Sequence, residues 1–340
     1  MTRLDEKLAR IHAGQYRHSD FVIADAKDGD MGPSLTSTGP KRAPDGSWTR
    51  YRTREEFLGE IRAVIAQDIV DIMLVSASNC ERLVESGAFH GSRVKPAIRA
   101  NDTTDVWVMR GATYASKPSR PFRTACLSRV MYGTAAPAPN APVVGTDLGL
   151  YSITFNNDLD ADHASLEAFN AFRADAAANG FKYFLEVFNP NVACGIAPEL
   201  VPHYVNDCIL RCLAGVTKAD RPQFLKIPYY GPKALDELAS FDPSLIVGVL
   251  GGGAGTTRDC FELLSQAELY GARIALFGRK LNLAEHQTTM VFFMRQVADG
   301  ALTPAEAVKA YHGELEKLGI RPLRSLEDDS LITEAVLKDA

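Results

Sequence analysis

The sequence predicts an α/β protein in which eight parallel strands close into a (β/α)8 barrel, the TIM-barrel fold. Three observations favour this class. Eight short runs rich in apolar and β-branched residues recur along the 340 residues, and each is followed by a loop and a stretch of helical periodicity. Apolar residues make up 46% of the chain, which is enough for a large core. We find no internal repeat beyond this alternation and no second core, so we predict one domain over residues 1–340.

The strand candidates are short, and they are separated by connections of unequal length. They lie at 21–25, 71–76, 94–99, 150–155, 183–188, 223–228, 245–250 and 273–278. In a barrel of this class the active site is built from the loops at the carboxyl ends of the strands. We therefore expect the catalytic residues at the ends of these strands and in the loops that follow them.

Helix start signals fall between these strands. The tetrapeptide TREE at 53–56 is a capping box that begins a helix running to about Asp68. TPAE at 303–306 is a second capping box, with proline at the first helical position. It predicts a C-terminal helix over about 303–319 that ends at a glycine suited to a C-cap.

Two connections are too long for ordinary loops of this fold, and we interpret them as insertions after strands one and three. They cover about 26–51 and about 100–148. Loops of this length in a compact domain are usually lids, binding loops or disordered segments. The second insertion concentrates positive charge at Arg110, Lys117, Arg120, Arg123 and Arg129. These cations either help to gather an anionic substrate or form a solvated surface.

Charge and hydropathy exclude several classes of partner. A net charge of -5 with no basic cluster among aromatic residues argues against nucleic acid and membrane surfaces, and favours small molecules. The first residues have no apolar stretch of signal-peptide length, and no later run reaches the roughly 18 apolar residues of a membrane span. The six cysteines show no disulfide-framework spacing, so we expect a cytoplasmic protein.

Lys226 lies near the end of a strand that otherwise predicts burial. Alternation along QFLKIP places Phe224, Lys226 and Pro228 on one face and Leu225 and Ile227 on the other. Lys226 then faces the barrel interior. An amine kept out of water loses affinity for its proton, and a neutral amine can attack a carbonyl to form a Schiff base. The alternative is an ion pair with an inward carboxylate.

Other polar groups accompany this lysine. The carboxyl group of Glu186 lies among aromatic residues in YFLEVF, where it can pass a proton or pair with Lys226. Asp25 ends the first strand and is the second expected acid–base group. The charged and phenolic residues that follow these strands are additional candidates: Lys27, Asp28, Asp30, Tyr229 and Tyr230.

Glycines gather at the ends of the last two strands. Strand seven leads into VLGGGAGTTRD, with Gly252 and Gly253, and strand eight ends in Gly278 and Arg279. Glycines let backbone N–H groups approach a phosphate, and barrels commonly bind phosphate after strands seven and eight. We therefore predict a phosphate site formed by these four residues, although tight turns alone also favour glycine.

These stretches together resemble the class I, Schiff-base aldolases of the deoxyribose-phosphate and tagatose-bisphosphate aldolase superfamily, including the bacterial and archaeal class I fructose-bisphosphate aldolases. The resemblance is clearest from FLKIPYYGP to LFGRKLN. It implies that Lys226 forms the Schiff base, that Asp25 and Glu186 are the catalytic carboxylates, and that the Gly-rich and Gly-Arg loops hold phosphate. It also implies a homo-oligomer.

Two departures separate this chain from those relatives. The strand LYSITF has no lysine where tagatose-bisphosphate relatives carry one, and the first strand continues ADAKDGDMG where fructose-bisphosphate relatives have Asp-His-Gly. Taken together, the sequence predicts an aldolase acting on a phosphorylated keto sugar, with no metal and no cofactor because the iminium is the electron sink. The alternatives are an acyltransferase or transaldolase-like enzyme of the same superfamily, or a barrel that binds a sugar phosphate without turnover.

Overall fold

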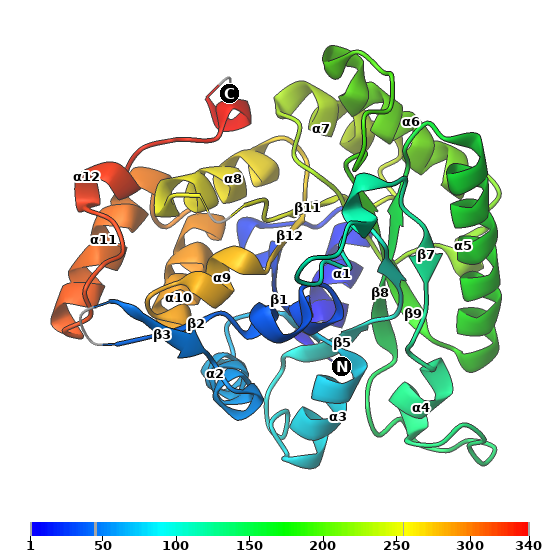
Figure 1. The fold of residues 1–340 in the computed structure, drawn as a ribbon, viewed down its shortest axis with the longest axis horizontal. Coiled ribbons are helices and arrows are strands. Elements are labelled where there is room, and N and C mark those ends of the chain that lie inside the picture. The colour runs from blue at the N-terminus through cyan, green and yellow to red at the C-terminus, as the bar shows by residue number, and fades with distance from the viewer. Residues whose placement is uncertain (1, 44–45, 254, 339–340) are drawn as a thin grey trace.

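The computed structural model describes residues 2–43, 46–253 and 255–338, and it contains a nearly closed barrel of parallel strands (Figure 1). The eight strands follow one another around the barrel in chain order, with β12 beside β1. A parallel bridge between Ile227 and Val249 joins the two ends of the sheet. The strands are β1 (Val22–Lys27), β4 (Ile72–Val75), β5 (Lys95–Arg99), β8 (Leu148–Thr154), β9 (Lys182–Phe188), β10 (Leu225–Lys226), β11 (Gly248–Leu250) and β12 (Ile274–Phe277). The predicted fold class and all eight strand positions are confirmed.

Side-chain alternation divides the core into two layers. One layer fills the barrel, where Phe184 and Phe224 stack with ring centroids 4.5 Å apart. The other layer lies between the strands and the surrounding helices, and it includes Leu225 and Ile227. This division is the one that the period of two predicts for a strand buried on both faces. Lys226 accordingly projects toward the barrel interior.

The helices surround the barrel and begin at identifiable caps. The capping boxes at Thr53 and Thr303 both form as predicted, and the C-terminal helix ends at Lys317 before Gly319. None of the helices in the described ranges is long and apolar enough to cross a membrane. The helices are α1 (Arg3–His12), α2 (Arg54–Gln67), α3 (Ala77–Glu85), α4 (Leu127–Tyr132), α5 (Leu159–Asn179), α6 (Val201–Leu213), α7 (Pro232–Phe241), α8 (Thr257–Leu269), α9 (Arg279–Leu283), α10 (Gln287–Ala298), α11 (Pro304–Lys317) and α12 (Leu326–Asp329).

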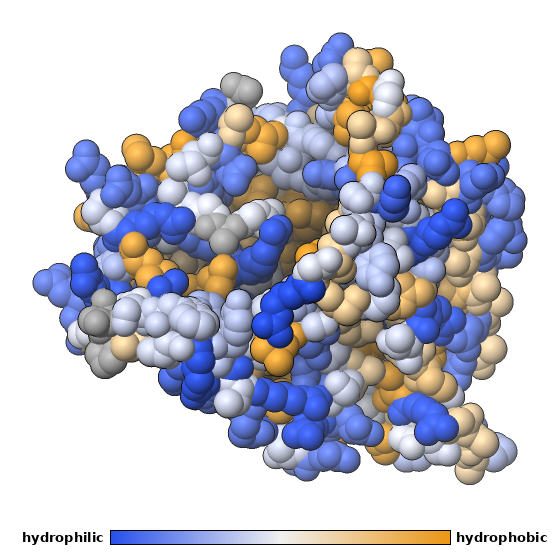
Figure 2. Space-filling view, in the orientation of Figure 1, coloured by the Kyte–Doolittle hydropathy of each residue, from blue (hydrophilic) through white to orange (hydrophobic). Residues whose placement is uncertain are grey.

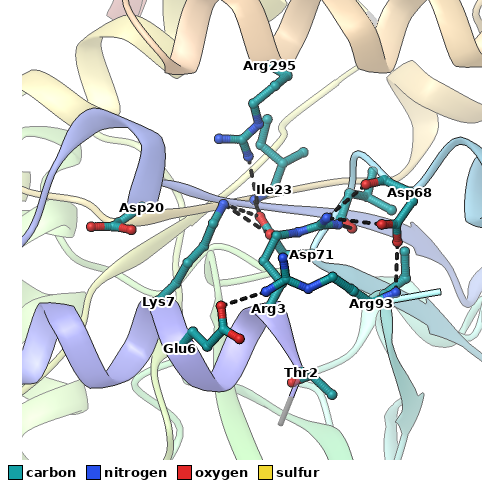
Figure 3. A network of polar contacts seen from close by, with 12 residues as sticks. Thr2, Arg3, Glu6, Lys7, Asp20, Ile23, Asp68, Asp71, Arg93 and Arg295 are labelled. Atoms are coloured by element: carbon teal, nitrogen blue, oxygen red, sulfur yellow. Dashed lines mark hydrogen bonds and ion pairs between the residues drawn. The ribbon is translucent and has the colours of Figure 1, made fainter. Parts of the chain in front are cut away.

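Helix α1 closes the amino end of the barrel and is anchored by one buried carboxylate (Figure 3). Its apolar face joins the barrel interior through Leu4 and Leu8. The carboxylate of Asp71 accepts hydrogen bonds from Arg3 Nε at 2.8 Å and Lys7 Nζ at 3.0 Å, and Arg295 of α10 lies 3.3 Å away. Asp71 therefore links α1, α10 and the sheet.

Both long connections contain short elements of their own. The first holds the antiparallel pair β2 (Pro40–Arg42) and β3 (Trp48–Tyr51), and its positions 44–45 lie outside the described residues. The second holds the antiparallel pair β6 (Asp102–Thr103) and β7 (Pro121–Phe122), followed by α4. Trp107 stacks on Tyr114 with ring centroids 4.9 Å apart, which gives this second insertion a local aromatic cluster.

Candidate active site

A cavity of about 750 Å³ lies at the carboxyl ends of the strands. Figure 2 shows the corresponding hollow near the middle of this face, with apolar residues at its bottom. The ends of β1, β5, β9, β10, β11 and β12 contribute to its wall, and so do both insertions, through residues 33–40 and 105–108. The cavity thus occupies the position in which barrels of this class carry their active sites.

Lys226 and Glu186 form an ion pair inside this cavity. The two residues are register partners on β10 and β9, so their side chains emerge side by side. The Nζ atom of Lys226 lies 2.6 Å from Oε1 of Glu186, and the two side chains are 7% and 1% exposed. The structure therefore brings together two of the predicted residues, in the pairing that the sequence left as the alternative to a free amine.

Arg99 and Ser152 complete the surroundings of Glu186, and sequence reasoning missed both. Ser152 is the register partner of Glu186 on β8, and its Oγ donates to Oε2 of Glu186 at 2.7 Å. Arg99, at the end of β5, donates to Ser152 Oγ at 3.0 Å and lies 3.5 Å from the same Glu186 oxygen. Glu186 therefore has a defined partner on each oxygen, which fixes its orientation toward Lys226.

Asp28 lies in the connection that follows β1, and its carboxylate contacts Arg99. Its Oδ2 atom accepts from Nε of Arg99 at 2.5 Å, and the residue lines the cavity. Burial opposes ionisation of Asp28, but the positive charges of Arg99 and Lys226 outweigh burial and lower its pKa. Asp28 is therefore held as a carboxylate, able to accept a proton.

Asp25 lies outside this cavity, on the side of β1 that faces the surrounding helices. Its register partners Met73 and Phe277 belong to the outer layer, and Asp25 lies on the same side of the sheet as they do, beneath the helices. It is fully buried, its nearest cation is Lys27 Nζ at 3.4 Å, and it does not line the cavity. Burial raises the pKa of Asp25 to about 6 and lowers that of Lys27. The alternation argument that oriented Lys226 would have oriented Asp25 outward, since it shares parity with Ile23.

The two tyrosines after the lysine also point away from it. Tyr229 Oη donates to Gln266 Oε1 at 2.9 Å, beneath α8. Tyr230 Oη donates to Asn189 Oδ1 at 2.7 Å, and burial raises the pKa of Tyr230 to about 12. Each hydroxyl thus has a partner of its own away from Lys226.

Asp102 adds a further carboxyl group near Arg99. Its Oδ1 lies 3.7 Å from the Arg99 guanidinium and has no hydrogen-bond partner among the described residues. Burial raises the pKa of Asp102 to about 7, although Arg99 acts in the opposite direction. Within the described ranges, no group of three or more His, Cys, Asp or Glu residues is arranged to hold a metal ion.

The predicted phosphate residues lie at one side of the cavity. Gly252, Gly278 and Arg279 line it, whereas Gly253 lines an adjoining cavity of about 210 Å³ that also contains Lys280. Gly252 has φ +62°, and a Cβ at Gly278 would approach a backbone oxygen of Ala26 at 2.9 Å. Chain geometry therefore requires these two glycines even without a ligand. Position 254 of this loop lies outside the described residues.

Solved structures with the same fold include archaeal class I fructose-1,6-bisphosphate aldolases. One is 15% identical and covers 87% of this chain and 99% of its own, with a TM-score of 0.59. A second, described as a Schiff-base-forming fructose-1,6-bisphosphate aldolase, is 16% identical over 88% and 100%, with a TM-score of 0.58. A third, with its catalytic lysine bound to a carbinolamine intermediate, is 16% identical over 87% and 98%, with a TM-score of 0.57. No family model and no curated protein sequence matches the chain. The resemblance seen in the sequence is thus confirmed at the level of the fold.

Proposed function

We propose that this barrel is a class I aldolase, which cleaves or forms a carbon–carbon bond in a phosphorylated keto sugar through a Schiff base at Lys226. The observation that carries the proposal is the position of Lys226, inside the cavity and 2.6 Å from a carboxylate that can take its proton. Structural neighbours that include a Schiff-base-forming fructose-bisphosphate aldolase support it.

The pair supplies the proton transfers that imine formation requires. Glu186 takes a proton from the Lys226 ammonium, and the neutral Nζ attacks the keto carbon of the substrate. The protonated Glu186 then gives its proton to the carbinolamine hydroxyl, which leaves as water and generates the iminium. Ser152 and Arg99 hold Glu186 in place during both transfers, through the contacts at 2.7 and 3.5 Å.

Bond cleavage needs a second base, and we assign this role to Asp28 in place of Asp25. Asp28 lines the cavity and is kept ionised by Arg99 and Lys226. It removes the proton from the hydroxyl group beyond the bond that breaks, and the electron pair of that bond moves to the iminium to give an enamine. Protonation of the enamine and hydrolysis of the resulting imine then free Lys226.

The phosphate of the substrate is assigned to the ends of β11 and β12. Arg279 and Gly278 line this side of the cavity, where the arginine provides positive charge, and Gly252 and Gly253 leave space for a close approach to the backbone. Holding the phosphate there fixes the distance between the keto carbon and Lys226, which favours the attack.

A second candidate is a barrel that binds a sugar phosphate without turnover. The 2.6 Å ion pair favours it, because a partner carboxylate alone accounts for a buried lysine. An aldolase and a binder differ in whether Lys226 ever becomes covalently attached to a ligand.

Reductive trapping tests the proposal. The protein is incubated with dihydroxyacetone phosphate or a ketose phosphate, treated with borohydride, and analysed by peptide mass spectrometry. We expect an adduct on Lys226 that is absent in Lys226→Arg and retained in the matched variant Lys27→Arg, which changes another lysine of the cavity wall. Labelling of other lysines only, or none with any ketose phosphate, would exclude the mechanism. Release of product without an acceptor aldehyde separates an aldolase from a transaldolase-like enzyme.

A further inference from the structure

We infer that the substrate carries a single phosphate group and an uncharged, hydroxyl-bearing distal end, and that Asp105 excludes a second phosphate. The inference rests on the proposed function, because it takes Lys226 as the point where the keto carbon is held and the ends of β11 and β12 as the phosphate side. It follows from how charge is distributed around the cavity.

The phosphate side of the cavity carries a cation, Arg279, that forms no ion pair with a carboxylate among the described residues. The Arg279 guanidinium donates to the Gly252 carbonyl at 3.0 Å. Lys280 belongs to the adjoining cavity, where its ammonium donates to the Gly255 carbonyl at 3.0 Å and where Asp259 and Glu334 also line the wall. The charge on this side of the main cavity is therefore that of Arg279, and it is available to one phosphate group.

The opposite side of the mouth carries a carboxylate, Asp105, that forms no ion pair with a described lysine or arginine. Asp105, in the insertion after β5, lines the cavity and accepts from Ser119 Oγ at 2.7 Å and from Thr154 Oγ1 at 2.9 Å. Thr154 ends β8, and in the barrel order β5 and β8 lie across from β11 and β12. Both partners of Asp105 are neutral, and no described lysine or arginine pairs with it.

The remaining cations of the cavity wall are already committed. Lys27 faces Asp25, Arg99 binds Asp28, and Lys226 pairs with Glu186. The exposed Arg110, Lys117 and Arg120 of the second insertion do not line the cavity.

A ligand that extends from the phosphate side past Lys226 therefore ends near Asp105. A second phosphate at that point would place two like charges together without a counter-ion, which is unfavourable. A hydroxyl group would instead donate to the carboxylate, and Asn189 adds an amide group to the same wall. These neighbours suit a polyol end.

Calorimetry with ligands that lack a carbonyl tests this inference separately from the chemistry. Glucitol 6-phosphate and glucitol 1,6-bisphosphate cannot form a Schiff base. We expect the wild-type protein to bind the monophosphate at least about tenfold more tightly. In Asp105→Asn the ratio should fall to about threefold or less, whereas Asp105→Glu should preserve it; thermal unfolding confirms that both variants are folded.

Equal or tighter binding of the bisphosphate by the wild-type protein would overturn the inference, and so would binding of neither glucitol ligand or an unchanged ratio in Asp105→Asn. Borohydride trapping separates this failure from that of the proposed function. A monophosphate preference without any adduct on Lys226 would contradict the aldolase proposal and support the single-phosphate specificity. Equal trapping of mono- and bisphosphorylated ketoses would support the aldolase proposal and contradict the single-phosphate specificity.

Discussion

The Nζ atom of Lys226 lies 2.6 Å from Oε1 of Glu186, and each residue is the other's register partner on neighbouring strands. The nucleophile that we propose is therefore stored as one half of a buried ion pair. Because neither side chain is more than 7% exposed, the pair has both a chemical and a structural consequence, and the two can be measured separately.

Glu186→Gln should slow turnover without unfolding the protein. The amide keeps the shape of the side chain but cannot take the proton of Lys226, so we expect kcat to fall by about a hundredfold to ten-thousandfold. Borohydride trapping at Lys226 should slow in parallel. An unchanged kcat would remove Glu186 from the proton transfers.

Glu186→Leu should destabilise the fold, because it leaves a buried ammonium without a counter-ion. We expect the free energy of unfolding in urea to fall by roughly 3 to 5 kcal/mol. The double variant Glu186→Leu with Lys226→Met should recover most of this loss, since the unpaired ammonium is then removed and Arg99 keeps Asp28 as its partner. Additive losses in the double variant would contradict this account of the pair.

Asp28→Asn and Asp25→Asn should differ in their effect on catalysis. Asp28 lines the cavity beside Arg99, and its replacement should lower kcat by about a hundredfold or more while Lys226 remains open to trapping. Asp25 lies in the outer layer, so Asp25→Asn should retain most of kcat at temperatures well below its unfolding transition. Steady-state kinetics and trapping on both variants check this, and the opposite ranking would return the role to Asp25.

Asp102 should make stability depend on pH in an identifiable direction. Its pKa is about 7 in the folded protein, against 3.8 for an ordinary aspartate. Between these values the folded state keeps a proton that the unfolded chain has lost, so the free energy of unfolding falls as pH rises through this window. The asparagine of Asp102→Asn does not titrate in this range. The free energy of unfolding of this variant, measured relative to wild type, should therefore rise from pH 4 to about pH 7 and then level off. Urea unfolding at several pH values measures the difference, and a constant difference would contradict the shift.

Asp71→Ala should be costly even though Asp71 is remote from the cavity. Removing the carboxylate leaves the positive charges of Lys7 and Arg295 buried without their partner, and we expect a loss of roughly 3 to 5 kcal/mol in the free energy of unfolding. Asp299→Asn is the matched control, since it removes the exposed partner of the same arginine at 3.1 Å. The control should cost less than about 1 kcal/mol. Similar losses in both variants would show that the buried position of Asp71 is unimportant.

Local patterns were sufficient to predict the strands, the two helix starts and the inward orientation of Lys226. Each depends on neighbours in sequence: alternation with a period of two, or a side chain that caps the helix it begins. Asp25 was predicted to face the cavity because it lies at the end of the first strand. The structure places it on the other side of β1, because strand parity and not proximity to the mouth decides the face.

The sequence by itself determined the barrel, its strand positions and the presence of a lysine inside it, because burial patterns and turn chemistry are local properties of the chain. Only the tertiary structure decided that Arg99, Ser152 and Asp28 surround the pair of Lys226 and Glu186. The five residues, counting the pair itself, come from four strands and one connection that are far apart in sequence. Their meeting depends on the register of each strand against the next, which is set by hydrogen bonds between distant segments and by closure of the sheet.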